Sequence, residues 1–311
     1  MSNHLNTIID KHNQVCNLQV VFVDIEKYSQ RRTSGQVAII NAFTNCIKSS
    51  LDEVAKQNIA FIQANDINFL KDIILIPTGD GCAINFSFDG LHNVHLRFSE
   101  LLMKKIYEFN ISSENCDKFN SNGWCNCHNK FNVRVGVTEG KGLIYKDVND
   151  NYNVAGNVIN MAARLLSIAE RNQVLFSEDA YKQIIDLVED PNFSDKFLKL
   201  SRIRIKHDIF IDAYIYNPSV EYINGNIPHD IIIKEKMKDV TQKLKDAGMP
   251  MPNFSAISEG NDANIDYKAI GSMMSSLFDI LQSADDKPVL TLQVPSEKEV
   301  DKPKKTRRSK K

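Results

Sequence analysis

Hydrophobic positions follow two patterns over the first 217 residues or so. Short continuous apolar runs are typical of buried strands, and spacings of three and four residues are typical of amphipathic helices. The runs predict strands over 18–23, 67–76, 82–88, 133–137, 143–145, 174–177, 200–206 and 210–216. The helical spacings predict helices over 34–56, 91–109, 154–169 and 178–187. Strands and helices interleaved in this way predict an α+β or mixed α/β sandwich.

The C-terminal third has a different pattern. Two amphipathic helices are expected over 231–247 and 267–283, joined by a polar linker. Residues 302–311 carry seven Lys or Arg side chains and are expected to form a disordered, solvated basic tail. The expected organisation is an N-terminal segment (1–17), one large domain (18–217), a helical extension (218–285) and a tail (286–311).

Composition narrows the class of protein. The formal net charge is −1, so there is no overall electrostatic case for a nucleic-acid-binding protein. The longest apolar runs span only a few residues, whereas a membrane-spanning helix needs about 20. The N-terminus lacks the layout of a signal peptide. We therefore expect a cytoplasmic protein without a membrane span.

Three of the six cysteines cluster in a polar stretch between residues 111 and 130. They are Cys116, Cys125 and Cys127, with His128 beside them. A zinc site is one reading, but the paired spacing of structural zinc ligands is missing. The favoured reading is a reduced surface insertion.

Two carboxylates lie at predicted strand ends. Asp24 follows the apolar run 20–23, and Asp80 lies in the turn 77–81 between two hairpin strands. Two carboxylates at adjacent strand ends would suit Mg²⁺ or Mn²⁺. Taken singly, Asp24 could equally be a helix-capping acid and Asp80 a turn former.

A second polar set lies on the helix predicted over 154–169. Asn160 and Arg164 are four residues apart and share one helix face. Arginine binds phosphate in a bidentate manner, and an amide can hold a ribose oxygen. Lys206 ends a predicted strand. The alternatives are an exposed polar pair and a solvated lysine. A P-loop is excluded, because the glycines of 136–142 have the wrong spacing and no Ser or Thr follows.

Together these segments resemble the catalytic domain of class III nucleotidyl cyclases. The stretch 21–29 resembles the first metal motif of that family, and 77–81 resembles the second. The strand 133–137 with Gly140 and the helix segment 156–165 resemble the motifs that follow them. The resemblance covers roughly residues 19–216, and it implies a mixed, mostly antiparallel sheet with flanking helices.

The resemblance also implies a reaction, the conversion of a nucleoside triphosphate into a 3′,5′-cyclic nucleotide and pyrophosphate. Asp24, Asp80 and the carbonyl of Ile25 would hold two divalent ions, Mn²⁺ or Mg²⁺. One ion would lower the pKa of the ribose 3′-hydroxyl and the other would neutralise the triphosphate. Tyr28 and Ser29 would belong to the loop that contacts the phosphates.

The other half of the site would come from a second subunit. In this resemblance Arg164 stabilises charge on the α-phosphate, Asn160 orients the ribose and Lys206 binds the terminal phosphates. The chain is therefore expected to be a homodimer with two composite active sites.

Two positions that read the base in the family are Ile76 and Asn153 here, and they match neither adenylyl nor guanylyl cyclases. This departure, in a short chain without a sensor domain, is similar to the pyrimidine cyclases of bacterial anti-phage (Pycsar) defence. We expect UTP, converted to cyclic UMP for a separate effector; the alternatives are CTP, then ATP or GTP. The non-enzyme alternative is an inactive pseudo-cyclase that senses a nucleotide. A different enzyme, a palm-type diguanylate cyclase or polymerase, is the third alternative.

Overall fold

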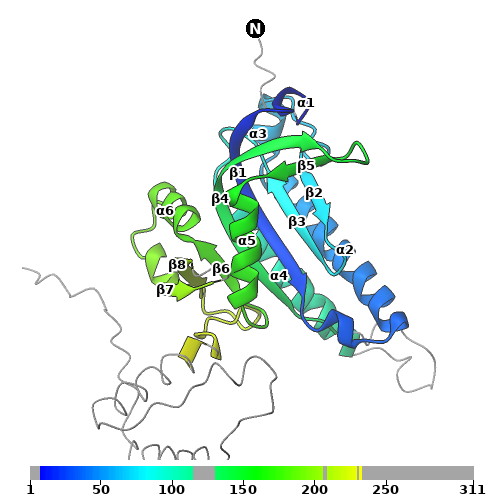
Figure 1. Ribbon diagram of the computed structural model, residues 1–311, viewed down its shortest axis with the longest axis vertical. Helices are drawn as coiled ribbons and strands as arrows, with labels where there is room; N and C mark the ends of the chain where they lie inside the picture. Colours follow the sequence, from blue (N-terminus) through cyan, green and yellow to red (C-terminus); the bar gives the residue numbers. More distant parts are fainter. Residues whose placement is uncertain (1–7, 115–129, 206–208, 230, 233–311) are drawn as a thin grey trace, which may run out of the picture. The chain divides into compact units, whose positions relative to one another are not determined.

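The computed structural model describes residues 8–114, 130–205, 209–229 and 231–232. All of them lie in one compact unit that spans residues 1–234. Its centre is a sheet in the order β2-β3-β1-β4-β6-β8-β7, with β5 paired to β4 (Figure 1). The strands are β1 (Val15–Ile25), β2 (Ile74–Pro77), β3 (Gly81–Phe86), β4 (Val133–Lys146), β5 (Tyr152–Ala155), β6 (Val174–Ser177), β7 (Phe197–Arg204) and β8 (Phe210–Tyr216).

Strand pairing makes the sheet mostly antiparallel, as expected. The pairs β1–β3, β1–β4, β2–β3, β4–β5, β6–β8 and β7–β8 are antiparallel, and β4–β6 is parallel. The central strand β1 is apolar almost throughout because both of its faces are covered.

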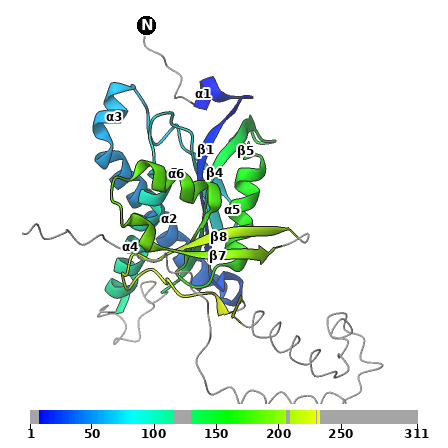
Figure 2. The same ribbon diagram turned by 90° about the vertical axis from the view of Figure 1, so that its left-hand side faces the viewer.

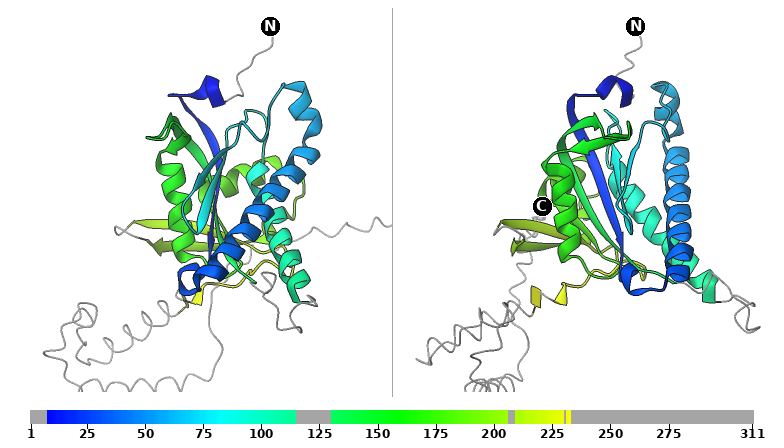
Figure 3. Two further views of the ribbon diagram at one scale, coloured as in Figure 1. Left: turned by 90° about the vertical axis from the view of Figure 1, so that its right-hand side faces the viewer. Right: turned by 45° about the vertical axis from the view of Figure 1, so that its right-hand side comes forward.

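Helices cover the two faces of the sheet unequally. The long helices α2 (Thr33–Gln57) and α4 (Val94–Glu114) lie on one face, and α5 (Asn157–Ile168) lies on the other (Figures 2 and 3). The shorter helices are α1 (Ile8–Lys11), α3 (Ile59–Ala64), α6 (Glu178–Leu187) and the 3-10 turns η1 (Tyr28–Gln30) and η4 (Phe193–Lys196).

Alternation along β1 determines which residue faces which layer. Val21 and Val23 belong to the large core beneath α2 and α4, whereas Leu18 and Val20 belong to the core shared with α5. Successive side chains of a strand point to opposite faces, so Asp24 lies on the α5 face.

Several element boundaries differ from the sequence-based prediction. Residues 154–155, predicted as helix, are the end of β5, and α5 begins only after Gly156, whose φ of 141° no helix accommodates. The strands predicted over 133–137 and 143–145 are one continuous strand, β4. Of the strand predicted over 67–76, only the end from Ile74 is β2. The short helix α3 was not predicted.

Candidate active site

The two predicted carboxylates lie side by side at the end of β1. Asp24 stands opposite Gly81 in the β1–β3 register, and the backbone N–H of Ile25 donates to the carbonyl of Asp80 at 3.0 Å. The structure therefore brings together two carboxylates that are 56 positions apart in the sequence. Two neighbouring carboxylates with the Ile25 carbonyl beside them supply the hard oxygen atoms that Mg²⁺ and Mn²⁺ prefer.

Glycines make this close approach possible. Gly79 has a φ of 90°, which side-chain-bearing residues rarely adopt, and it shapes the turn that carries Asp80. A Cβ on Gly81 would lie 2.6 Å from the carbonyl oxygen of Val23. The hairpin turn can therefore approach β1 only with glycine at position 81.

A third charged residue at this strand end was missed at the level of sequence. Arg134 on β4 faces Asp24 directly in the β1–β4 register, and its guanidinium forms an ion pair with the Asp24 carboxylate. Its Nε is buried without a hydrogen-bond partner in the described chain. Arginine at this position could move from the carboxylate to a phosphate group.

Burial raises the pKa of Asp24, and the neighbouring Asp80 carboxylate raises it further, whereas Arg134 opposes both effects. The Asp24 and Asp80 carboxylates therefore repel each other, and the positive charge of Arg134 does not fully offset the effects of burial and repulsion on Asp24. A divalent cation between them would remove the repulsion, so the residues present fit a metal site. Among the described residues no group of three or more His, Cys, Asp or Glu converges on one point. That agrees with Mg²⁺ sites that use one or two carboxylates and complete their shell with substrate phosphates and water.

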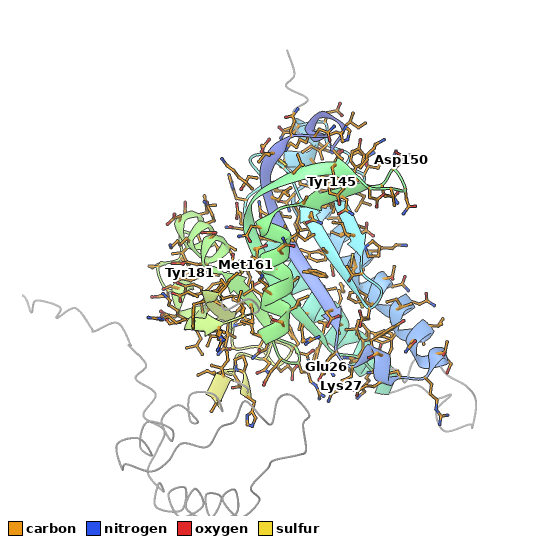
Figure 4. All side chains as sticks on the ribbon, viewed as in Figure 1. Glu26, Lys27, Tyr145, Asp150, Met161 and Tyr181 are labelled. Atoms are coloured by element: carbon orange, nitrogen blue, oxygen red, sulfur yellow. The ribbon has the colours of Figure 1, made fainter. Side chains whose placement is uncertain are left out.

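The turn after β1 holds the predicted phosphate loop. Tyr28 and Ser29 form η1, directly after Lys27, which adopts the left-handed conformation with a φ of 56°. Glu26 binds Arg171 at 2.9 Å and lies 3.6 Å from the Lys27 ammonium. Figure 4 shows Glu26 and Lys27 together at this end of β1.

Asn160 and Arg164 lie on α5, where the sequence placed them. Asn160 is exposed and Arg164 is half-buried, and neither side chain has a hydrogen-bond or ion-pair partner among the described residues. In particular, no such bond joins them to Asp24 or Asp80 within one chain. The helix itself is held tightly, because a Cβ on Gly136 of β4 would lie 2.4 Å from the carbonyl oxygen of Ala162.

The two predicted base-reading residues lie on strands that approach each other, β2 and β5. Ile76 is partly buried against the core shared with α5. Asn153 stands opposite Tyr145 in the β4–β5 register, and its side-chain oxygen accepts from the N–H of Val154 at 2.7 Å. One of the two lone pairs of the amide oxygen is therefore used, and the NH₂ group has no partner among the described residues.

Several predicted features lie outside the described residues. They are Lys206, the cluster of Cys116, Cys125, Cys127 and His128, the helices expected over 231–247 and 267–283, and the basic tail. Within the described part of the chain, no helix is both long and apolar enough to cross a membrane.

A mixed sheet that joins two carboxylates at one strand end, with a helix carrying Asn and Arg on the same face, is the arrangement of a nucleotidyl cyclase. The family model for the adenylate and guanylate cyclase catalytic domain matches residues 10–206. The chain belongs to this family. It is a nucleotide cyclase, a lyase acting on nucleoside triphosphates. Members of the family generally use two divalent ions and form dimers with composite sites.

Two similar solved structures are distant from this chain in sequence. The adenylyl cyclase CyaB from P. aeruginosa is 17% identical, with 68% of this chain and 98% of that chain covered and a TM-score of 0.44. The guanylate cyclase domain of RhGC from Catenaria anguillulae, in complex with GTP, is 16% identical, with 65% and 96% covered and a TM-score of 0.42. No curated protein sequence matched the chain. The family assignment rests on the sequence model.

Proposed function

We propose that the protein converts UTP into cyclic UMP and pyrophosphate, in a homodimer with two composite sites. The observation that carries the choice of base is the hydrogen bond between the Asn153 amide oxygen and the N–H of Val154. It occupies one of the two lone pairs of the Asn153 oxygen, whereas the NH₂ group has no partner among the described residues and is the freer half of the amide. A donor suits O4 of uracil and is mismatched with the N4 amino group of cytosine or the N6 amino group of adenine.

The preference for uracil over guanine has a separate support. Guanine also presents a carbonyl oxygen, so the donor alone does not separate the two. The resemblance to pyrimidine cyclases at positions 76 and 153 favours the smaller base. Ile76 contributes shape and no hydrogen bond to this pocket.

Asp24, Asp80 and the Ile25 carbonyl would hold the metal ions. When bound, these ions supply Lewis acidity toward the ribose 3′-hydroxyl and the triphosphate. Asp24 and Asp80 orient the reacting end of the nucleotide through that site, and the loop with Tyr28 and Ser29 lies where the phosphates would follow. Displaced from Asp24, the guanidinium of Arg134 can neutralise phosphate charge.

Asn160 and Arg164 would act on the nucleotide held by the partner subunit. Asn160 orients the ribose, and Arg164 stabilises charge that develops on the α-phosphate. Their lack of partners among the described residues supports this assignment, because unpaired polar groups on a helix face are ready for a ligand. Lys206 would bind the terminal phosphates from the same subunit.

The cyclic nucleotide would serve as a second messenger for a separate effector in anti-phage defence, as the resemblance implies. CTP is the alternative substrate, followed by ATP and GTP. The non-enzyme alternative is a nucleotide-sensing pseudo-cyclase. It is disfavoured because Asp24, Asp80, Asn160 and Arg164 are all retained.

The test is incubation of the purified protein with Mn²⁺ and each of the four nucleoside triphosphates, followed by mass spectrometry of the products. We expect cyclic UMP to dominate and to vanish in Asp80→Ala and in Arg164→Ala. If no triphosphate gives a cyclic product, the proposed conversion of UTP by the purified chain is refuted, which favours a pseudo-cyclase or an enzyme that needs an activator.

Two further variants sharpen the test. Mixing Asp80→Ala with Arg164→Ala should restore roughly one quarter of the activity, because about half of the dimers are mixed and each then has one intact site. Failure of the mixture to recover would refute composite sites. Asn153→Asp replaces the donor by an acceptor, so it should shift the product ratio from cyclic UMP toward cyclic CMP.

A further inference from the structure

A cavity lies at the end of β6, away from the paired carboxylates of the active site. It is bounded by residues 138–141 of β4, the first turns of α5 and α6 and the start of β8, and its volume is about 440 Å³. Figure 1 shows α5 and α6 on either side of this region. The volume is in the range of small-molecule sites.

The walls of this cavity are acidic. Four carboxylates line it, those of Glu139, Glu178, Asp179 and Asp212, against the single ammonium of Lys141. Two of the four are already neutralised. Glu178 pairs with Lys182 at 2.9 Å, and Asp212 pairs with Lys199 at 2.8 Å.

Glu139 and Asp179 remain without a lysine or arginine partner among the described residues. Asp179 is exposed in the first turn of α6 and makes no hydrogen bond or ion pair within the described chain. Glu139 is nearly buried and accepts one hydrogen bond, from the Asn17 amide at 2.9 Å. Burial raises the pKa of the Glu139 carboxyl, and the Asn17 hydrogen bond and the nearby His92 offset this only in part, so a further cation would stabilise the ionised form.

His95 does not provide that compensation. Its side chain is fully buried behind Glu139, with Nε2 3.5 Å from the Glu139 carboxylate, and neither ring nitrogen has a hydrogen-bond partner in the described chain. Burial lowers the pKa of His95 to about 3, so the imidazole is neutral at physiological pH. A buried neutral imidazole thus lies against Glu139 and adds no positive charge to it.

The spacing of the carboxylates favours an organic cation over a metal ion. They come from three different elements, β4, α6 and β8, with apolar side chains among them. Val158, Met161, Phe210 and Ile211 line the cavity as well, together with the polar side chains of Thr138, Asn157 and Ser177. Figure 4 places Met161 on the side of α5 that faces this cavity and α6. Separated charges on an apolar floor match ammonium groups separated by methylenes.

We propose that this cavity binds a linear aliphatic diamine or polyamine, with one ammonium on Glu139, another on Asp179 and the carbon chain over Met161 and Phe210. The site goes beyond the cyclase reaction and does not depend on which base is the substrate. It adjoins the catalytic helix, because Asn157 and Met161 line the cavity one turn away from Asn160 and Arg164.

Isothermal titration of the full chain tests this directly, with 1,4-diaminobutane and spermidine as probes. The titrations are run at constant ionic strength without nucleotide, because polyamines bind triphosphates. We expect saturable binding with one ligand per chain. Butylamine, with one ammonium, should bind about tenfold or more weakly, since a charge-assisted contact is lost.

The variants are Asp179→Asn and the isosteric Glu139→Gln, with Asp186→Asn as the matched control on the exposed face of α6, outside the cavity. Each of the first two should weaken diamine binding about tenfold, and the control should bind as the unmodified chain does. Far-UV circular dichroism checks that all three fold. Equal binding by all three variants, no saturable binding, or displacement of the diamine by equimolar Mg²⁺ would overturn the proposal.

Discussion

Replacing Gly136 by alanine tests how closely the position of α5 controls activity. Gly136 lies on β4, where the helix that carries Asn160 and Arg164 rests on the sheet. The backbone at this position is extended, so alanine meets no conformational penalty, and only the added methyl group matters. That Cβ would lie 2.4 Å from the carbonyl oxygen of Ala162 and 3.1 Å from Cβ of Leu165.

The required displacement follows from these contacts. Real Cβ atoms essentially never approach backbone closer than 3.0 Å, so α5 must retreat by about 0.6 Å or more. Overpacking of this kind costs about 1–3 kcal/mol of stability. A misplacement near 1 Å can cost a catalytic site on the order of 10²-fold in rate, so we expect kcat to fall between tenfold and a hundredfold.

The assay pairs cyclic-nucleotide production with thermal unfolding, and the control is Val137→Ala. Val137 is the next residue of the same strand, is fully buried, and faces α4 instead of α5. Losing its two methyl groups costs a similar 1–3 kcal/mol or so and leaves α5 in place. The reasoning fails if both variants lose the same activity, because the loss would then reflect stability alone.

Three further predictions concern charged and polar groups. Arg134→Met leaves Asp24 beside Asp80 without its cation, so the metal-free protein should lose about 1 kcal/mol and the rise in Tm caused by Mn²⁺ should be larger than in the unmodified chain; an equal rise would contradict it. Burial lowers the pKa of His95 to about 3, so between pH 6.5 and 3 the unfolded chain binds a proton that the folded chain does not. The free energy of unfolding should therefore decrease as the pH is lowered through this range, by up to about 1.4 kcal/mol per pH unit. Urea unfolding of His95→Gln at several pH values should show a pH dependence weaker by that amount, and an unchanged pH dependence would exclude His95 as the source. Tyr216→Phe removes a donor that reaches Glu100 at 2.5 Å, and urea unfolding should show a loss of roughly 1.5–3 kcal/mol; a loss below 0.5 kcal/mol would mean that water replaces the bond.

The parts of the site that occur as contiguous motifs could be found from the sequence. Asp24 ends an apolar run, Asp80 lies in a turn and Asn160 and Arg164 share a helical spacing; local pattern made them candidates, and the order of the four cyclase-like motifs singled them out. The strand end that joins the two carboxylates is confirmed by the register of β1 and β3. The mixed, mostly antiparallel sheet was also predicted correctly.

The parts that depend on register or on a turn could not be found in this way. Arg134 is one polar residue in an apolar strand, and only the β1–β4 pairing shows that it faces Asp24. The end of β5 was taken for helix because Val154 fits both periods, and the boundary depends on the backbone of Gly156. The orientation of the Asn153 amide depends on a hydrogen bond to its neighbour, which no sequence pattern encodes.

The placement of the two half-sites explains why a second copy would be needed. Asp24 and α5 lie on the same face of the sheet, yet no hydrogen bond or ion pair joins Asn160 or Arg164 to the carboxylates of their own chain. Two groups that project from one face cannot close on a single nucleotide unless another surface faces them. In a two-fold dimer each subunit would present its Asn160 and Arg164 to the Asp24 and Asp80 of the other subunit. The symmetry then produces two equal sites. The same symmetry predicts that any ligand acting on α5 in one subunit alters the site whose metal residues belong to the other.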